Sequence, residues 1–264
     1  MVVDILRPRT VREAVRAKAG DGTAYLGGGT WLNSRRTDAP VILISLEHLG
    51  LGTIEQAGDR LSLGATVTFQ QVRDASSMPA ALREAVSLTA SRTLRNMKTI
   101  GGEIGRWPAD SALIPALLAL DAEVLLAGRR KPVPIVELNR EAGDLVLGVL
   151  VPRAPRLSAA RAVSRTSHSP ASLVVAVSAG AVSPLLSNTR IGLSDCQGQL
   201  VRLTAVEEAL NGSPLPPEEQ IEGMIGRAFA PAADMHGSAA YKRYVAGVLV
   251  ADALHGLRED GKPS

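Results

Sequence analysis

A chain of 264 residues with 45% apolar and 21% charged side chains has the composition of a globular protein that buries a sizeable core. Its net charge of +3 comes from scattered arginines without a long basic block, which favours a solvated surface over a nucleic-acid site. The single cysteine, Cys196, excludes an internal disulfide, an iron–sulfur cluster and a cysteine-based zinc site.

The start of the chain lacks the features of a secretory signal. Met1 to Thr10 has neither the charged start nor the long apolar stretch of a signal peptide. No apolar run elsewhere reaches the length of a transmembrane helix. We therefore expect a cytoplasmic protein with neither a membrane nor a nucleic acid as its partner.

Residues 1–54 predict a small α/β unit. Thr10 and Glu13 form a capping box, which predicts a helix over 10–19. Strands are expected at 2–6, 24–26 and 40–46. This order of strand, helix and strand is typical of an α/β unit.

Residues 55–155 predict a second α/β unit. Alternating apolar residues from Leu61 to Val67 indicate a half-buried strand, and Thr68 with Gln71 forms another capping box. One helix is expected over 80–89, and another starts at Asp110 or Ser111 and runs to Leu120. Further strands are expected at 123–126, 133–136 and 145–151.

Residues 156–264 predict an α+β domain that follows a boundary at Pro152–Pro155. Strands are expected at 161–166, 173–181 and 190–203, the last bent at Gln197–Gly198. Thr204 and Glu207 form a capping box for a helix that ends at Asn211–Gly212. Two more helices are expected at 217–229 and 238–257.

Two glycine-rich stretches are the candidates for a binding site. Gly27, Gly28 and Gly29 follow the second strand and precede Thr30, and Thr99-Ile100-Gly101-Gly102 lies further along. Glycine leaves backbone N–H groups accessible to an anion, so two such loops can hold a pyrophosphate from both sides. Each stretch alone is weak evidence, because a glycine run is more often a tight turn and neither stretch fits the dinucleotide-binding or P-loop pattern.

The neighbours of the glycines make the pair specific. Residues 26–32 read LGGGTWL, 95–104 read RNMKTIGGEI, 115–124 read PALLALDAEV and 238–254 read SAAYKRYVAGVLVADAL. In this order, from Asp4 to about Leu257, they resemble the FAD-binding medium subunit of the molybdenum hydroxylases, the family of xanthine dehydrogenase and carbon monoxide dehydrogenase. The resemblance implies an α+β protein, with two small α/β subdomains forming a PCMH-type FAD-binding fold before an α+β C-terminal domain that holds a small antiparallel sheet and helices.

The resemblance also implies where FAD binds. An extended FAD would lie between the first two domains and the third, with its pyrophosphate at the backbone amides of the glycine stretches. The implied contact residues are Leu26, Gly27, Gly28, Gly29, Thr30 and Trp31 in the first stretch and Thr99, Ile100, Gly101, Gly102 and Glu103 in the second. The hydroxyl groups of Thr30 and Thr99 can add hydrogen-bond donors.

Three positions depart from the family's pattern. Glu103 stands where an asparagine is common, and a carboxylate beside a pyrophosphate is repelled unless it points away or accepts from a sugar hydroxyl. Trp31 stands where a small or acidic residue is usual. Ala112 occupies the position of an aspartate that holds a flavin hydroxyl, so Asp110 either replaces that carboxylate or caps the following helix.

Arg161 matches a family position that is often basic and close to the flavin. A cation there would stabilise the reduced, anionic ring, and the alternative is a solvated arginine at a strand edge. The four histidines share no metal-ligand spacing and no nucleophile-elbow motif is present, so neither metal nor hydrolase chemistry has support. Tyr241 and Tyr244, three residues apart, are expected to pack in the core.

The function implied by the resemblance is electron relay, with no catalytic side chain. In this family a molybdopterin-containing large subunit hydroxylates the substrate, and a [2Fe-2S] small subunit carries electrons to the flavin subunit. The flavin subunit passes them to NAD, oxygen or another acceptor. Two alternatives stay open: an assembly subunit of the same fold with weak or lost FAD binding, and a self-contained flavin oxidase, for which 264 residues leave little chain to form a substrate pocket.

Overall fold

The computed structural model describes residues 1–32, 39–89, 91–139, 143–152, 157–166, 169, 171–195 and 200–260. They form two compact units whose segments alternate along the chain. The first unit comprises residues 1–71, 91–106 and 123–151, and the second comprises residues 72–90, 107–122 and 152–264. The division into three consecutive domains therefore stays a prediction, and each unit is described by itself.

The first unit begins with a three-stranded parallel sheet in the order β1-β3-β2. Its strands are β1 (Val2–Leu6), β2 (Thr23–Leu26) and β3 (Val41–Ser45). Helix α1 (Val11–Lys18) begins as the capping box predicts, because Thr10 Oγ1 accepts a hydrogen bond from the Glu13 amide at 3.2 Å. The Glu13 carboxylate accepts from the Arg9 amide at 2.9 Å, which lowers the pKa of Glu13. Ala14 of α1 packs with Ile44 and Leu46 in a small core.

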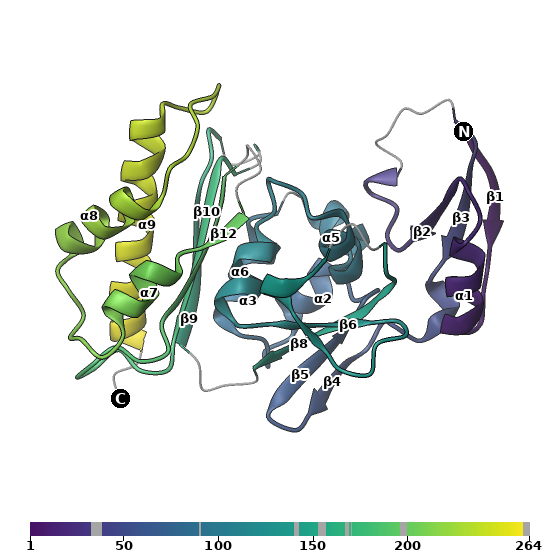
Figure 1. The fold of residues 1–264 in the computed structure, drawn as a ribbon, viewed down its shortest axis with the longest axis horizontal. Helices are drawn as coiled ribbons and strands as arrows, with labels where there is room; N and C mark the ends of the chain where they lie inside the picture. The colour runs from purple at the N-terminus through teal and green to yellow at the C-terminus, as the bar shows by residue number, and fades with distance from the viewer. Residues whose placement is uncertain are drawn as a thin grey trace. The chain divides into compact units, whose positions relative to one another are not determined.

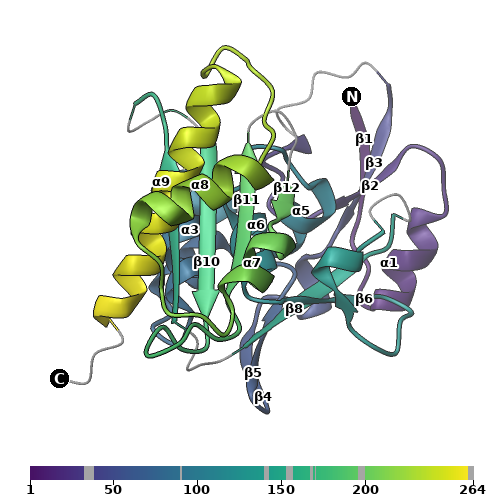
Figure 2. The same cartoon turned by 60° about the vertical axis from the view of Figure 1, so that its left-hand side comes forward.

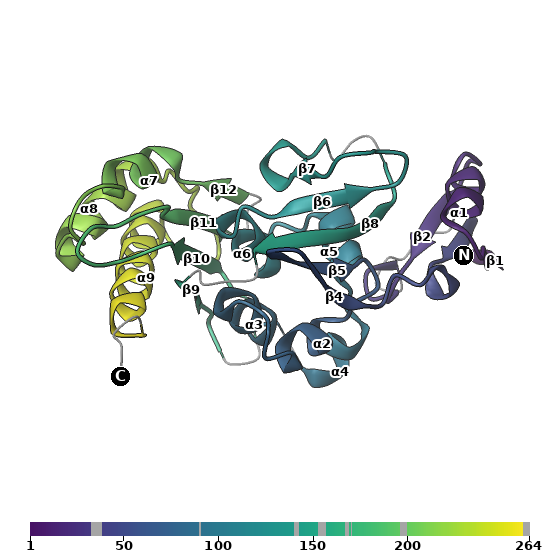
Figure 3. The same ribbon diagram turned by 90° about the horizontal axis from the view of Figure 1, so that it is seen from below.

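The first unit also contains a five-stranded sheet in the order β4-β5-β8-β6-β7 (Figure 3). Its strands are β4 (Ile54–Ala57), β5 (Arg60–Gly64), β6 (Glu123–Leu126), β7 (Val133–Pro134) and β8 (Val146–Pro152). Two 3₁₀ turns, η2 (Glu47–Leu49) and η3 (Ile135–Glu137), lie in the connections. Leu61 and Leu63 are buried while Arg60 and Ser62 are half-buried, so the predicted half-buried strand is confirmed up to Gly64.

Three short helices follow along the chain: α2 (Phe69–Asp74), which continues into the second unit from Val72, and α4 (Arg92–Met97) and α5 (Ile100–Arg106), which belong to the first. The capping box before α2 is confirmed, because the Thr68 amide donates to Gln71 Oε1 at 2.8 Å and the Gln71 amide donates to Thr68 Oγ1 at 3.3 Å. The prediction that Thr99–Gly102 is a loop is wrong. Thr99 precedes α5 and its Oγ1 accepts from the Gly102 amide at 3.2 Å, so the two glycines form the first turn of a helix.

Close packing explains why this helix starts with glycines. The Ile100 amide donates to Val67 O at 2.9 Å, and the Gly101 amide donates to Ala65 O at 2.8 Å. A Cβ on Gly101 would lie 2.6 Å from the Ala65 Cβ, which is closer than atoms can approach. The turn thus needs glycine at position 101 to lie against the segment that leaves β5.

The second unit is built on a four-stranded antiparallel sheet in the order β12-β11-β10-β9. Its strands are β9 (Leu157–Val163), β10 (Leu173–Ala179), β11 (Arg190–Asp195) and β12 (Leu200–Arg202). Helices α7 (Thr204–Leu210), α8 (Glu218–Ala228) and α9 (Ala239–Asp260) cover one face, and α3 (Ala80–Ser87) and α6 (Leu113–Ala119) cover the other (Figures 1 and 2).

Burial on both faces explains the apolar composition of these elements. All seven residues of β10 are buried. All seven residues of α6, which contains most of the PALLAL motif, are buried as well. The α+β class and the small C-terminal antiparallel sheet are confirmed. No helix within the described ranges is long and apolar enough to cross a membrane.

Two predictions for the second unit are wrong. Glu207 does not complete a capping box with Thr204, because its carboxylate accepts from the Ile191 amide and pairs with Arg202, both at 2.9 Å. Tyr241 and Tyr244 are 46% and 63% exposed, so they do not pack in the core. The bend at Gln197–Gly198, Cys196 and the part of the predicted boundary at 153–155 lie outside the described residues.

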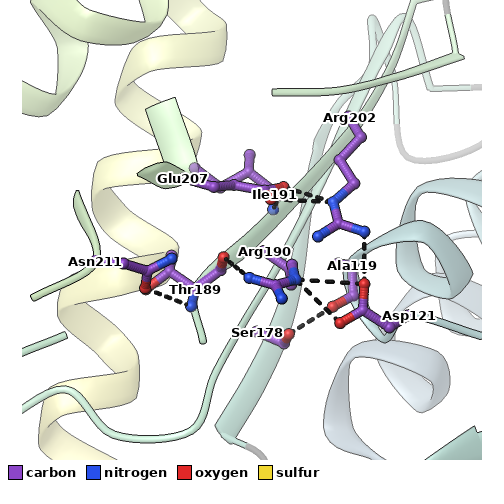
Figure 4. A network of polar contacts seen from close by, with 9 residues as sticks. All are labelled: Ala119, Asp121, Ser178, Thr189, Arg190, Ile191, Arg202, Glu207 and Asn211. Carbon is purple, nitrogen blue, oxygen red and sulfur yellow. Dashed lines mark hydrogen bonds and ion pairs between the residues drawn. The ribbon is translucent and has the colours of Figure 1, made fainter. Parts of the chain in front are cut away.

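A polar network links the end of α6 to β11, β12 and α7 (Figure 4). Asp121, which follows α6 with a left-handed φ of 49°, pairs with Arg190 at 3.0 Å and with Arg202 at 2.5 Å. Arg202 also pairs with the buried carboxylate of Glu207. Burial acts to lower the pKa of Arg202, but the contacts with Glu207 and Asp121 outweigh it and raise that pKa above its usual value.

Candidate functional site

A pocket of about 410 Å³ lies in the first unit and brings the two glycine stretches together. Its volume is within the range of small-molecule sites. Strand β2, the loop after it, the start of α5 and the segment before β8 form its wall. Of the predicted contact residues, the pocket is lined by Gly27, Gly28, Gly29, Thr30, Trp31, Thr99, Gly101, Gly102 and Glu103. Leu26 and Ile100 do not line it.

The first glycine loop supplies unpartnered backbone donors. Within the part of the chain that the structure describes, the amides of Gly27, Gly28 and Gly29 donate no hydrogen bond to another residue. Gly29 adopts a left-handed φ of 71°, which side-chain-bearing residues rarely take. Adjacent free N–H groups facing a concave wall are the usual cradle for a phosphate oxygen.

Two of these glycines also fix the position of the loop. A Cβ on Gly28 would lie 1.4 Å from the Met97 carbonyl oxygen, and a Cβ on Gly27 would lie 2.8 Å from Thr99 Oγ1. The loop therefore rests directly on the segment 97–99. This contact brings the first stretch against the second, as the pairing of the two motifs suggested.

The second stretch contributes less backbone than its sequence indicates. The amides of Ile100 and Gly101 donate to Val67 and Ala65, so they are not free donors for a ligand. The Gly102 amide donates to Thr99 Oγ1. The expectation that this stretch binds a pyrophosphate through its backbone amides is therefore wrong for Ile100, Gly101 and Gly102. Its glycines allow close packing, and Glu103 lines the pocket.

Several charged residues that the sequence did not predict as contacts line the pocket, among them Lys98 and Arg106. Lys98 pairs with the buried Glu103 at 3.3 Å, and the Arg106 guanidinium lies 5.9 Å from the centroid of the Trp31 ring. Both basic residues flank the TIGGEIG segment, and that position beside the glycines was the available signal. With Lys18 and Asp144, the charged residues of the pocket carry a small positive excess, which suits an anionic ligand.

Tyr25, in β2, also lines the pocket. Burial raises the pKa of its hydroxyl, and the nearby carboxylate of Asp144 raises it further. Tyr25 therefore stays protonated near neutral pH and can donate a hydrogen bond. Asp144 itself pairs with Arg129 at 3.4 Å.

Asp110 and Arg161 belong to the second unit. Asp110 is exposed, and the cap of α6 comes from its neighbour, because Ser111 Oγ accepts from the Ile114 amide at 3.2 Å. The capping role proposed for Asp110 is thus taken by Ser111. Ala112 is buried.

Arg161, in β9, pairs with Asp252 of α9 at 2.7 Å and with Glu84 of α3 at 3.4 Å. Its charge is therefore already balanced by two carboxylates, one from each helix layer of the second unit. No group of three or more potential metal-binding side chains occurs among the described residues.

Comparison with known proteins gives two family matches that together span the chain. Residues 1–154 match the FAD binding domain in molybdopterin dehydrogenase, and residues 158–257 match the CO dehydrogenase flavoprotein C-terminal domain. The Escherichia coli protein YgfM is 37% identical over 268 residues, covering 99% of both chains.

Two further relatives carry functional names. The medium subunit of nicotine 6-hydroxylase from Paenarthrobacter nicotinovorans is 26% identical over 242 residues, covering 84% of both chains. The solved structure of carbon monoxide dehydrogenase from Hydrogenophaga pseudoflava superimposes with a TM-score of 0.86 at 26% identity, covering 97% of this chain and 96% of the other.

Proposed function

The chain belongs to the FAD-binding subunits of the molybdenum hydroxylases, and we propose that within such a complex it relays electrons from iron–sulfur clusters to a terminal acceptor. It is an oxidoreductase component with FAD as its cofactor. A bound FAD would supply the chemistry of exchanging electrons one or two at a time. The protein groups bind, orient and tune the cofactor, so no side chain acts as an acid or base.

The observation that carries this proposal is the first glycine loop. Its unpartnered amides and the small positive excess of the pocket fit the diphosphate of FAD. We propose that Gly27, Gly28, Gly29 and Thr30 hold the diphosphate. The exposed ring of Trp31, fixed beside Arg106, would offer an apolar face to one of the planar rings of the cofactor.

The partners in this proposal are a molybdopterin-containing large subunit and a [2Fe-2S] small subunit. The chain has one cysteine, whereas a [2Fe-2S] cluster takes four cysteine ligands, so the clusters must lie on another chain. Oxidation of the substrate at the large subunit would release two electrons. The acceptor that takes them is NAD, oxygen or another oxidant, and we place the assembly in the cytoplasm.

Asp110 and Arg161 remain proposed contacts. Because Ser111 caps α6, the exposed carboxylate of Asp110 is available to accept a hydrogen bond from a flavin hydroxyl. A charge-assisted hydrogen bond of this kind is worth roughly 1.5–3 kcal/mol, which is about a tenfold to hundredfold change in affinity. Arg161 would act through the field of its guanidinium, weakened by Asp252 and Glu84.

Spectroscopy and titration test the proposal. The chain copurified with its partners should show the absorbance of oxidised flavin, which bleaches when the substrate of the complex is added without oxygen. FAD titrated into the isolated chain should bind, and Asp110→Asn should weaken that binding about tenfold or more, whereas Asp59→Asn, at an exposed turn, should not. A complex that turns over its substrate without flavin would instead support the assembly-subunit alternative.

A further inference from the structure

The ion pair of Lys98 and Glu103 is an unusual feature to find in the wall of a site for an anion. The Glu103 side chain is only 5% exposed and that of Lys98 is 23% exposed, and both line the pocket beside the glycine loop. A buried carboxylate in that place opposes the binding of a diphosphate unless another group neutralises it. Among the described residues, Lys98 pairs with this carboxylate at 3.3 Å and so supplies a neutralising charge.

The backbone holds Lys98 close to the glycine loop. Met97 and Thr99, its two neighbours, are the residues on which Gly28 and Gly27 rest. The Lys98 carbonyl accepts from the Phe69 amide at 2.9 Å, and the ammonium lies 5.4 Å from the centroid of the Phe69 ring. Lys98 is therefore anchored by its backbone, while its partly exposed side chain lines the pocket and pairs with Glu103.

We propose that Lys98 is a positioning residue for the cofactor's diphosphate and that Glu103 sets how much of its charge the ligand experiences. With the pocket free, the ammonium neutralises Glu103. With a nucleotide diphosphate bound, the same ammonium is shared between Glu103 and the phosphate oxygens, while the glycine amides bind the oxygens directly. This inference rests on the proposed function, since the diphosphate is that of FAD.

The direction in which Glu103→Gln changes ligand affinity distinguishes this role of Glu103 from a second possible one. If Glu103 reduces the charge of Lys98, Glu103→Gln removes a negative charge from the pocket and tightens the binding of a diphosphate. If Glu103 instead accepts a hydrogen bond from a sugar hydroxyl of the ligand, the same substitution weakens binding. Glutamine keeps the size of the side chain and leaves the partly exposed Lys98 in place, so this variant creates no unpaired charge in the buried position of Glu103.

The experiment is a set of titrations on the full chain with FAD, ADP and riboflavin as probes. We expect Glu103→Gln to bind FAD and ADP about tenfold more tightly and Lys98→Gln to bind both about tenfold less tightly. The double variant should lie between the two. Riboflavin, which lacks phosphate, should change by less than twofold in every variant. The gain from Glu103→Gln should shrink as salt is added.

The outcomes distinguish this inference from the function on which it rests. A wild-type chain that binds FAD, but whose affinity falls on Glu103→Gln, overturns the role of Lys98 and leaves the flavin function standing. Equal effects on riboflavin and FAD overturn it as well. A wild-type chain that binds no flavin, alone or with its partners, overturns the proposed function itself. Thermal unfolding of each variant shows whether Lys98→Gln is folded, and Lys98→Arg, which keeps the charge, should retain the affinity of the wild type for ADP.

Discussion

At the scale of single residues, two of the three adjacent glycines of the binding loop, Gly28 and Gly29, are needed for different physical reasons. Position 29 needs glycine because its backbone is left-handed. Position 28 needs glycine because a Cβ there would collide with the Met97 carbonyl. Replacing Gly28 therefore tests the contact between the two glycine stretches and not only access to the ligand.

We expect Gly28→Ala to lower both stability and FAD affinity. Its Cβ would lie 1.4 Å from the Met97 oxygen, so the loop must move away, at roughly 1–3 kcal/mol for an overpacked site. Gly226→Ala, in the last turn of α8 where a Cβ meets no atom within 4 Å, is the matched control and should be neutral or stabilising. Thermal melts and FAD titrations measure both effects. Unchanged values for Gly28→Ala would show that the loop moves freely from Met97.

Sequence alone predicted the two glycine stretches of the pocket because the residues of each motif lie next to one another in the chain. Nine of the eleven predicted residues in the glycine stretches line it. The side chains of Lys98 and Arg106 were missed, because their positions depend on how α4 and α5 meet the glycine loop. The local sequence does not predict that Lys98 pairs with Glu103, because this ion pair depends on the turn between α4 and α5.

At the scale of elements, the network around Arg202 explains why a good local signal failed. Thr204 and Glu207 have the spacing of a capping box, but Glu207 instead accepts from the Ile191 amide of β11 and pairs with Arg202 of β12. A tertiary contact with a buried carboxylate outweighs a cap worth about 1 kcal/mol. By contrast, the capping box at Thr10 forms, because the Thr10 hydroxyl and the Glu13 carboxylate both accept hydrogen bonds from amides at the start of the helix.

We expect Arg202→Met to destabilise the protein by about 2–4 kcal/mol. It leaves the carboxylate of Glu207, which is 4% exposed, without its cation and removes one partner of Asp121 (Figure 4). Arg129→Met is the control, because its pair with Asp144 is more exposed and should be worth no more than about 1 kcal/mol. Denaturant unfolding of the two variants gives the comparison. Equal losses would mean that the network contributes no more than a surface pair.

The second glycine stretch gives the same lesson for helix prediction. Two consecutive glycines argue against a helix by propensity, yet residues 100–106 form α5. The Gly101 amide donates to the Ala65 carbonyl and the Gly102 amide donates to Thr99 Oγ1, and the approach of Gly101 to Ala65 leaves no room for a Cβ. Packing against the segment 65–67 decided the conformation, and a single sequence does not show which segments come into contact.

At the scale of the whole molecule, the two compact units do not follow the order of the chain. Helices α3 and α6 come from the part that matches the FAD binding domain, but both pack on the antiparallel sheet that begins at residue 157. The sequence predicted a helix that starts at Asp110 or Ser111 and runs to Leu120, without indicating which sheet it packs on. Hydrophobic periodicity thus predicts that an element is buried, while the partner that buries it depends on contacts between distant segments.

The division of chemistry among chains leads to the last prediction, which concerns the isolated protein. Substrate oxidation in this proposal needs a molybdenum centre and clusters that a chain with one cysteine cannot provide. Loaded with FAD, the chain alone should show at most a slow transfer of electrons from NADH to an artificial acceptor. It should oxidise no organic substrate.

Activity assays on the isolated chain and on the complex that copurifies with it decide the matter. A panel of aldehydes and nitrogen heterocycles, with a dye as the acceptor, should give turnover only with the complex. The Lys98→Gln variant serves as an internal control, because its weaker FAD binding should lower flavin content and NADH–dye activity together while leaving the partners' clusters unchanged. Oxidation of any of these substrates by the chain alone would require a substrate site of its own and would support the self-contained flavin oxidase.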